Sequence, residues 1–400
     1  SKYQNKPLWS VGGSWNIYKE KFFQADFVDM LKLRASYGIG GNIGRNTAPY
    51  LIASYYDSSL VDGMAGSVNT PPNKDIRWEK TTTVNVGVDF ALFRHRLSGT
   101  IEYYNKYSVD LLAAINGSPT QGFGYTTLMT NNGKMVNRGV EITLSGEIIR
   151  QKDFSWNASL LYAFNRNKVK HISVQPSLWD SRISMPTSYP MVGKPLYGIY
   201  AYKWAGLNEN GDPQVYDAEN NVTSGPARDY HALVYCGTTV PIHNASLTNV
   251  LRYKGFEFSA MLILDAGHKL RSSNIPSINM SNGRITSTAK GIVDRWTQPG
   301  DVTDVPRLLF SNDTENFNTH RTELYRYSDL FVYDASNIRL SNISLAYRVP
   351  AHWCKKISLS GARLQFNVEN VATFAFDSKA NYDLGGKVKP NYVWGLYLNF

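Results

Sequence analysis

The 400-residue sequence predicts an all-β fold, a segment of an antiparallel, membrane-spanning β-barrel. Three observations carry this prediction. Apolar and polar residues alternate with a period of two, connections alternate between short and long, and no stretch supplies the roughly eighteen apolar residues of a membrane-spanning helix. The nearest approach to such a helix, residues 256–264, is interrupted by Glu257 and Ser259. Any membrane span is therefore expected to be a strand.

The alternation locates the strands. Between residues 139 and 148, Val140, Ile142 and Leu144 alternate with Glu141 and Thr143, which gives one apolar face and one polar face. Apolar positions shift from even to odd numbers near Ser341-Asn342, which predicts a β-bulge there. Eleven strands are expected near residues 8–17, 29–38, 82–91, 97–106, 138–149, 154–165, 243–253, 256–265, 336–349, 357–369 and 391–400.

Alternation alone does not decide between a barrel and a soluble sandwich, because both have strands with one polar face. The lengths of the connections distinguish the two classes. Short links at 93–96, 150–153 and 254–255 alternate with long irregular stretches. Short turns at one end and long loops at the other are typical of an outer-membrane barrel, and the long stretches are then extracellular. They run from 39 to 80, 107 to 137, 165 to 242, 266 to 332 and 370 to 390. The odd strand number predicts the second part of a larger barrel, because complete bacterial barrels have an even number.

Aromatic residues near the predicted strand ends favour the same class. Their rings suit a membrane–water interface, although aromatic cross-strand pairs in a soluble sheet explain any single one. The set is Trp9, Trp15, Tyr103, Tyr104, Trp156, Tyr162, Tyr253, Tyr347, Trp353, Tyr392 and Trp394.

The composition supports strands and argues against a nucleic-acid partner. The chain has 31 glycines, 26 tyrosines and 9 tryptophans, and 18% of its residues are charged. Exposed helices are instead rich in Ala, Leu, Glu and Lys. The formal charge of +10 is spread along the chain, with Lys355-Lys356 its closest approach to a cluster. Such a background suits lipid phosphates outside a barrel or anionic solutes inside it, and both remain open.

Two further features bear on the cell compartment and on the chain start. Cys236 and Cys354 allow at most one disulfide; two unpaired thiols are favoured, and whether they pair is left open. The residues after Ser1 do not show the positively charged region and the apolar region of an export signal. We therefore expect either that an export signal was removed or that this is not the true start.

Several short motifs follow one another along the chain. They are Leu31 to Gly38 with Gly41-Asn42, Ile76 to Lys80, Asn85 to Phe90, Asn132-Gly133 with Asn137 to Glu141, Val192 to Pro195 leading to Gly206-Leu207 and Asn210 to Pro213, Arg295-Trp296, Asp334 to Leu340, and Asn367 to Asn370. Together they resemble the SusC/RagA family of TonB-linked outer-membrane proteins from Bacteroidetes. The resemblance covers nearly the whole chain, and Asn132-Gly133 with Asn137 to Glu141 is its most diagnostic stretch.

The resemblance implies a larger assembly. Complete members of the family are barrels of about twenty-two strands that enclose an N-terminal plug. Residues 1–400 are then the C-terminal part of the barrel, about its last eleven strands, and the plug and the TonB box are absent from this chain. A half-barrel alone has two unpaired edges. The N-terminal half of the barrel and outer-membrane lipid are therefore expected partners.

The last residues form a terminal strand that, by the same resemblance, serves as a recognition tag for barrel assembly. Its even-numbered positions form an apolar row that ends on an aromatic residue, which a terminal strand of a soluble protein would not explain. The row is Tyr392, Trp394, Leu396, Leu398 and Phe400.

The function implied by the resemblance is active nutrient import. A surface lipoprotein of the SusD type captures an oligosaccharide or a peptide, and the TonB complex drives its release into the periplasm. Loop aromatics are candidates for substrate contact, and for most of them packing between loops is the favoured role. These candidates are Tyr55, Tyr56, Trp179, Tyr189, Tyr197, Tyr200 and Trp204. The alternative function is a passive porin or a structural or adhesive barrel without energy coupling.

Catalysis and cofactors are not expected. The sequence has no Gly-x-Ser-x-Gly, His-Glu-x-x-His or Cys-x-x-Cys motif. Asp265 and His268 lie close together, but no nucleophile accompanies them. Residues 208–212 offer oxygen ligands around a glycine without the spaced acidic residues of a calcium loop, so a Gly-Asp-Pro hairpin turn is favoured over a metal site.

Overall fold

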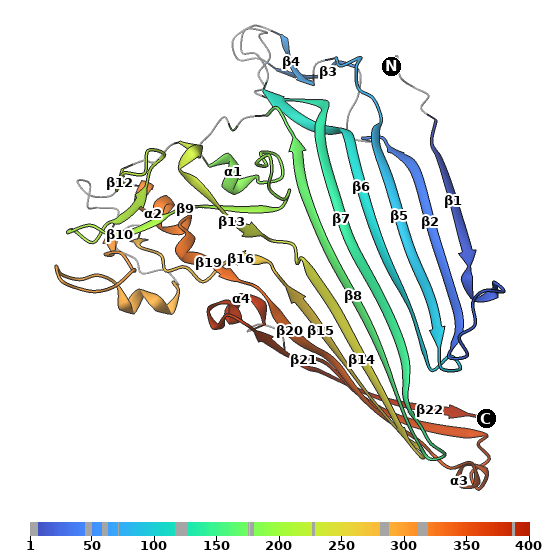
Figure 1. The fold of residues 1–400 in the computed structure, drawn as a ribbon. Helices are drawn as coiled ribbons and strands as arrows, with labels where there is room; N and C mark the ends of the chain where they lie inside the picture. Colours follow the sequence, from blue (N-terminus) through green and yellow to red (C-terminus); the bar gives the residue numbers. More distant parts are fainter. Residues whose placement is uncertain are drawn as a thin grey trace.

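The computed structural model describes residues 7–44, 50–57, 63–70, 72–116, 127–174, 176, 180–225, 229–280, 288–310, 319–385 and 389–400. Within these residues, eleven strands form one open antiparallel sheet (Figure 1). They are β1 (Trp9–Asn16), β2 (Val28–Asn42), β5 (Glu79–Leu92), β6 (Leu97–Asn116), β7 (Thr127–Arg150), β8 (Phe154–His171), β14 (His243–Tyr253), β15 (Phe256–Ala266), β20 (Asn337–Arg348), β21 (Gly361–Ala375) and β22 (Asn391–Asn399).

The eleven predicted strands are all present, and each pairs with the next one along the sheet. The structure corrects several boundaries. β6 and β7 continue to Asn116 and from Thr127 because their backbones stay paired where the apolar alternation has ended. β21 begins at Gly361 rather than near residue 357, because the short helix α3 (Ala351–Lys355) and Ser358, with a φ of 59°, occupy the preceding turn.

The predicted bulge is confirmed at Ser341. In the pairing of β20 with β15, Met261 opposes Asn342 while Leu262 opposes Leu340, so Ser341 is an extra residue. The next strand, β21, carries one further extra residue around Asn370, which has a φ of 53°. Two extra residues restore the original parity, so the apolar positions of β21 stay even-numbered throughout.

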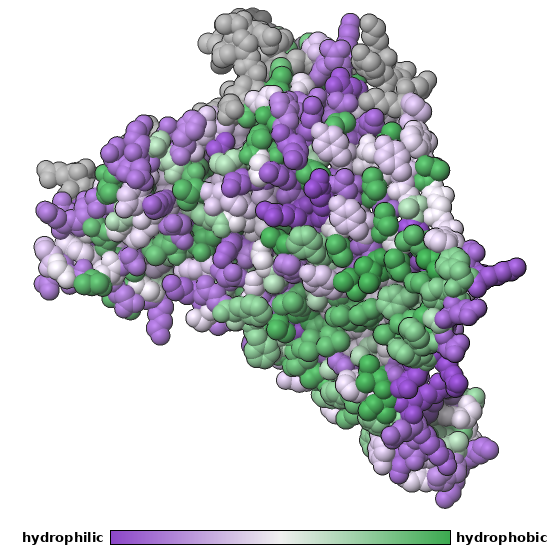
Figure 2. All heavy atoms as spheres, in the orientation of Figure 1, coloured by the Kyte–Doolittle hydropathy of each residue, from purple (hydrophilic) through white to green (hydrophobic). Residues whose placement is uncertain are grey.

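One face of the sheet is an exposed apolar surface. The register aligns Leu33 of β2 with Val88 of β5 and Val88 with Ile101 of β6, and equivalent rows continue to β22. On β22, Trp394 is 78% exposed and Leu396 is 61% exposed. Figure 2 shows apolar residues gathered over the lower part of the strands, between polar connections at the upper left and a polar tip at the lower right. A soluble domain would bury such a surface.

The two ends of the sheet differ as predicted. The short links gather at the end where the chain terminates, and the long connections gather at the other end (Figure 1). In the link from β5 to β6, Phe93, Arg94 and His95 all have a positive φ, which closes a tight turn. In the described part of the chain, no helix has the length and apolar character that crossing a bilayer requires.

The described parts of the long connections contain strands and helices, so the prediction of irregular stretches was wrong for these parts. Strands β9 (Gly198–Tyr202) and β13 (Leu233–Thr238) pair, and they pack with α2 (Thr319–Arg326) around a buried core that contains Tyr200 and Tyr202. Apolar periodicity did not reveal these elements because they are short and show little alternation. The remaining elements are β3 (Ile52–Asp57), β4 (Met64–Thr70), α1 (Ser181–Ser184), β10 (Trp204–Leu207), β11 (Pro213–Tyr216), β12 (Val222–Thr223), β16 (Lys269–Arg271), β17 (Asn279–Met280), β18 (Leu309–Phe310), β19 (Val332–Asp334) and α4 (Asn381–Leu384), with 3-10 turns at Ile17–Lys19, Tyr230–Ala232, Lys290–Asp294, Asp329–Phe331 and Ser378–Ala380.

Candidate functional site

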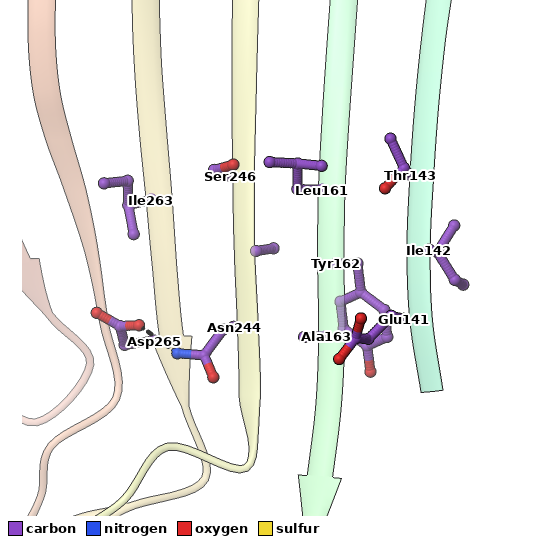
Figure 3. A pocket seen from close by; sticks show the side chains of 11 residues that line it. Glu141, Ile142, Thr143, Leu161, Tyr162, Ala163, Asn244, Ser246, Ile263 and Asp265 are labelled. Atoms are coloured by element: carbon purple, nitrogen blue, oxygen red, sulfur yellow. Dashed lines mark hydrogen bonds between the residues drawn. The ribbon is translucent and has the colours of Figure 1, made fainter. Parts of the chain in front are cut away.

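The face of the sheet opposite the apolar surface is polar and carries a shallow hollow of about 310 Å³ (Figure 3). Two rows of side chains line the hollow across β7, β8, β14 and β15. The register places Glu141, Ala163, Asn244 and Asp265 in one row, and Thr143, Leu161, Ser246 and Ile263 in the next row. Because the rows are two residues apart on every strand, all eight side chains share one face.

The acidic groups of this hollow differ in their partners. The Asn244 amide donates to Asp265 Oδ1 over 2.7 Å, and the Arg339 guanidinium donates to Asp265 Oδ2 over 2.8 Å. Within the described residues, the exposed Glu141 carboxylate has no hydrogen-bond or ion-pair partner from the protein. The Glu141 carboxylate is therefore a hydrogen-bond acceptor on the polar face that no described protein group occupies.

A second polar group ties β2, β5 and β6 together on the same face. The Arg34 guanidinium donates to Asp89 over 3.3 Å and to Glu102 over 2.6 Å. Thr100 donates to Asp89, and the Asn85 amide donates to Glu102. Charge-assisted bonds of this kind fix the side chains of neighbouring strands. The polar face is thus a hydrogen-bonded wall, and it contains no arrangement of nucleophile and base among these groups.

The folded connections are held by a partly buried charge cluster around Asp212. Arg321 is 2% exposed and donates to Asp212 over 2.6 Å and to Asn279 over 2.5 Å. Arg307 donates to both oxygens of the same carboxylate, over 3.1 and 2.9 Å. Burial lowers the pKa of Arg321, and the hydrogen bond to Asp212 opposes this shift. The cluster joins three segments that are far apart in the sequence.

The segment before Asp212 is the predicted turn. Asn208 Oδ1 accepts hydrogen bonds from the backbone amides of Asn210 and Asp212, and Gly211 has a φ of 73°. These bonds occupy the Asn208 oxygen, and Arg307 and Arg321 occupy the Asp212 carboxylate. In the described part of the chain, no three His, Cys, Asp or Glu side chains gather as metal ligands.

Three of the predicted loop aromatics lie within the folded connections. Tyr200 is 1% exposed, and its hydroxyl accepts a hydrogen bond from the Met191 amide. Burial raises the pKa of Tyr200. Tyr189 is also buried, and Trp204 packs against the Tyr325 ring at 5.9 Å. These three rings therefore pack inside the folded connections, and their contact with a substrate stays a prediction.

Three other loop aromatics are exposed. Tyr55 and Tyr56 lie on β3 and are 72% and 54% exposed, and Tyr197 is 47% exposed. Trp179 lies outside the described residues. Contact of this group with a substrate stays a prediction.

The terminal strand lies at one edge of the sheet. Along β22, Tyr392, Trp394, Leu396 and Leu398 share the exposed apolar face, and Phe400, just past the strand, is 93% exposed. The aromatic ring of Phe366 on β21 lies 4.2 Å from that of Trp394. The role of this strand in barrel assembly stays a prediction.

Sequence reasoning missed the hollow and the charge cluster. Alternation placed Glu141 and Asp265 on polar faces, but only the register between strands brings their rows together. Arg321 and Asp212 are separated by 109 residues, and no motif connects them. Both cysteines, which sequence reasoning left open, are free thiols.

Comparisons with known proteins agree with the fold. The TonB dependent receptor-like β-barrel family matches residues 1–371. TonB-dependent receptor P3 of Formosa agariphila is 26% identical over 99% of this chain and 40% of its own length. TonB-dependent receptor SusC of Bacteroides thetaiotaomicron is 26% identical over 90% of this chain and 36% of its own length.

Solved structures share the same architecture. The structure of the RagAB peptide transporter matches 100% of this chain and 44% of its own chain, with a TM-score of 0.79 and 23% identity. The RagAB peptide importer in its open-open state matches with a TM-score of 0.73 and 24% identity. The chain spans between 36% and 41% of the curated relatives that it matches.

The match to the family over residues 1–371 has a physical counterpart in the exposed apolar face, the polar face and the asymmetric connections. That family is one of transporters and receptors rather than enzymes. The chain belongs to the TonB-dependent receptor family, and its eleven strands are antiparallel transmembrane strands of a SusC/RagA-like β-barrel in the bacterial outer membrane.

Proposed function

We propose that this chain forms the wall and outer loops of a TonB-dependent nutrient importer. The observation that carries the proposal is the family match over residues 1–371. The polar face supports it, because Glu141, Asn244 and Asp265 supply hydrogen-bonding groups along one wall. A molecule that crosses a barrel needs such a wetted surface, whereas the apolar face suits lipid.

The proposal assigns residues 1–400 to the C-terminal part of the barrel. The partial coverage of the curated relatives, 36% to 41% of their length, supports this assignment. The plug, the TonB-contacting segment and the other half of the barrel then belong to the remainder of the assembly. Closing the barrel would satisfy the open edges of β1 and β22.

The folded connections are the proposed seat of a SusD-like lipoprotein lid. Their own buried core and the Asp212 cluster support this role, since a partner that opens and closes needs a rigid base. The cargo is an oligosaccharide or a peptide. Tyr55 and Tyr56 are the proposed contacts because their exposed rings can stack on sugars or apolar side chains.

Uptake measurements in cells that produce the complete protein test the proposal. Labelled oligosaccharides and peptides would be offered to cells with and without a functional TonB complex. We expect uptake to require TonB. We also expect Tyr55→Ala with Tyr56→Ala to lower the apparent affinity about tenfold, since each stacking contact contributes roughly 0.5–1.5 kcal/mol.

Tyr253→Ala is the matched control, because Tyr253 is 53% exposed but lies at the short-turn end. It should leave uptake unchanged. Uptake that continues without TonB would overturn the import proposal in favour of a passive porin. A double variant with full affinity would remove Tyr55 and Tyr56 from the substrate path and leave import itself standing.

A further inference from the structure

The short links between the strands carry a large share of the net charge. The name covers all connections at the short-turn end of the sheet, which are residues 17–27, 93–96, 151–153, 254–255 and 349–360, and the connections at the other end keep the name long connections. Together they contain eight Lys or Arg and three Asp or Glu, which is +5 of the total +10. The long connections at 43–78, 117–126, 172–242, 267–336 and 376–390 contain eighteen Lys or Arg and nineteen Asp or Glu. Among the connections, net positive charge is therefore found at one end of the strands only.

The cations of the short links are available to an outside partner. All eight side chains are exposed. In the described part of the chain, no acidic side chain pairs with Arg94, Lys152, Lys355 or Lys356, whereas Arg252 next to these links is paired with Glu257 at 2.7 Å. The eight cations are Lys19, Lys21, Arg94, Arg96, Lys152, Lys254, Lys355 and Lys356.

Exposed aromatic side chains accompany these cations. Phe93 in the link from β5 to β6 stacks on Phe27 at 5.8 Å, and both rings are more than half exposed. Trp353 on α3 is 54% exposed, beside Lys355 and Lys356. Figure 2 shows the polar tip that contains α3 directly below the apolar residues of the strands. Aromatic rings with cations just beyond an apolar band occupy the headgroup level of a bilayer.

We propose that these short links form a binding rim for the phosphate headgroups of anionic phospholipids in the leaflet at the short-turn end. Each unpaired cation attracts an anionic headgroup, and the neighbouring rings hold the rim at the depth of the phosphates. The near-neutral long connections lack this attraction. The rim therefore distinguishes the two sides of the membrane and favours phosphatidylglycerol over the zwitterionic phosphatidylethanolamine.

Native mass spectrometry of the complete protein tests this rim. The protein would be purified from membranes, exchanged into mixed micelles with equal amounts of the two lipids, and scored for the ratio of retained phosphatidylglycerol to phosphatidylethanolamine. The rim variant removes four unpaired cations with Arg94→Gln, Lys152→Gln, Lys355→Gln and Lys356→Gln. The control removes four exposed cations of the long connections with Lys74→Gln, Lys290→Gln, Arg295→Gln and Lys389→Gln.

We expect wild type and the control to retain phosphatidylglycerol with a preference of about tenfold, and the rim variant to fall below about twofold. A charge-retaining variant with Arg94→Lys, Lys152→Arg, Lys355→Arg and Lys356→Arg should keep the wild-type preference. This result would show that the rim variant loses the preference through lost charge and not through misfolding. A rim variant with the wild-type ratio would overturn the proposal and point to an acidic macromolecule as the partner of these cations. An equal loss in the control would overturn it as well, because the preference would then follow total charge.

Discussion

At the scale of single residues, Arg321 shows how the long connections are fixed. Its side chain is almost fully buried, and it joins Asp212, Asn279 and the carbonyl of Arg307. These partners lie on different segments. One guanidinium therefore holds together stretches of chain that are far apart in the sequence. Removing a partner of a buried charge is costly because the remaining groups stay out of water.

We predict that Arg321→Met loosens the folded connections without affecting the sheet. The Asp212 carboxylate keeps Arg307 but loses its shorter bond, at 2.6 Å. The expected loss of local stability is about 2 kcal/mol. Hydrogen–deuterium exchange of residues 204–216 measures it, with strands β14 and β15 as an internal reference.

Arg295→Met provides the matched control for this prediction. Arg295 is an exposed arginine in the same long connection and makes one weak bond, to the Ile292 carbonyl at 3.4 Å. Its replacement should leave exchange unchanged. Equal protection of residues 204–216 in Arg321→Met and wild type would show that the cluster does not hold the connections.

Sequence reasoning was least informative at this scale. Tyr55 and Tyr200 look alike in the sequence as tyrosines of long connections, yet Tyr55 is 72% exposed and Tyr200 is 1% exposed. Their burial depends on contacts with distant segments, such as Leu324 of α2 against the core around Tyr200. No local pattern encodes those contacts.

At the scale of elements, the strands could be predicted because the polarity of their side chains follows the environment on each face of the sheet. A strand between lipid and water shows the alternation in every residue pair, so the eleven strands and the bulge were visible. The far ends of β6 and β7 could not be predicted in this way. Residues 107–116 pair with residues 127–136 although their side chains lack the alternation.

The bulge gives a prediction for this scale. We expect deletion of Ser341 to permit barrel assembly, because Ile338, Leu340 and Ile343 then share one face of a regular strand. Deletion of Ser344 should prevent assembly, because it turns Leu345 and the residues after it to the polar face. Heat-modifiable migration on gels reports the assembled fraction of each variant. A larger assembled fraction for the Ser344 deletion than for the Ser341 deletion would contradict the assignment of Ser341 as the extra residue.

At the scale of the whole molecule, apolar surface is distributed in two ways. The connections bury their apolar residues around Tyr200 and Tyr202, as soluble proteins do. The sheet instead exposes apolar residues such as Trp394 and Leu396. The bilayer therefore has to replace the missing core of the sheet.

We predict that the two faces respond oppositely to a new charge. Leu345 is 46% exposed on the apolar face, and its neighbour Ser344 points to the polar face. Leu345→Arg should destabilise the protein by about 2 kcal/mol or more, and Ser344→Arg should cost much less. Denaturant unfolding in phospholipid bilayers compares the two variants. Similar losses would argue that the apolar face does not meet lipid.

The native thiols have a practical consequence for experiments on this chain. Cys236 on β13 and Cys354 on α3 lie at opposite ends of the strands (Figure 1). Burial raises the pKa of the Cys236 thiol to about 11, and Cys354 is 1% exposed. Both should react slowly with maleimides, because the thiolate is the reactive form and a buried sulfur is inaccessible. A cysteine introduced at Tyr55 or Lys152 would then be the labelled site, and impermeant dyes could report orientation with the natural cysteines in place.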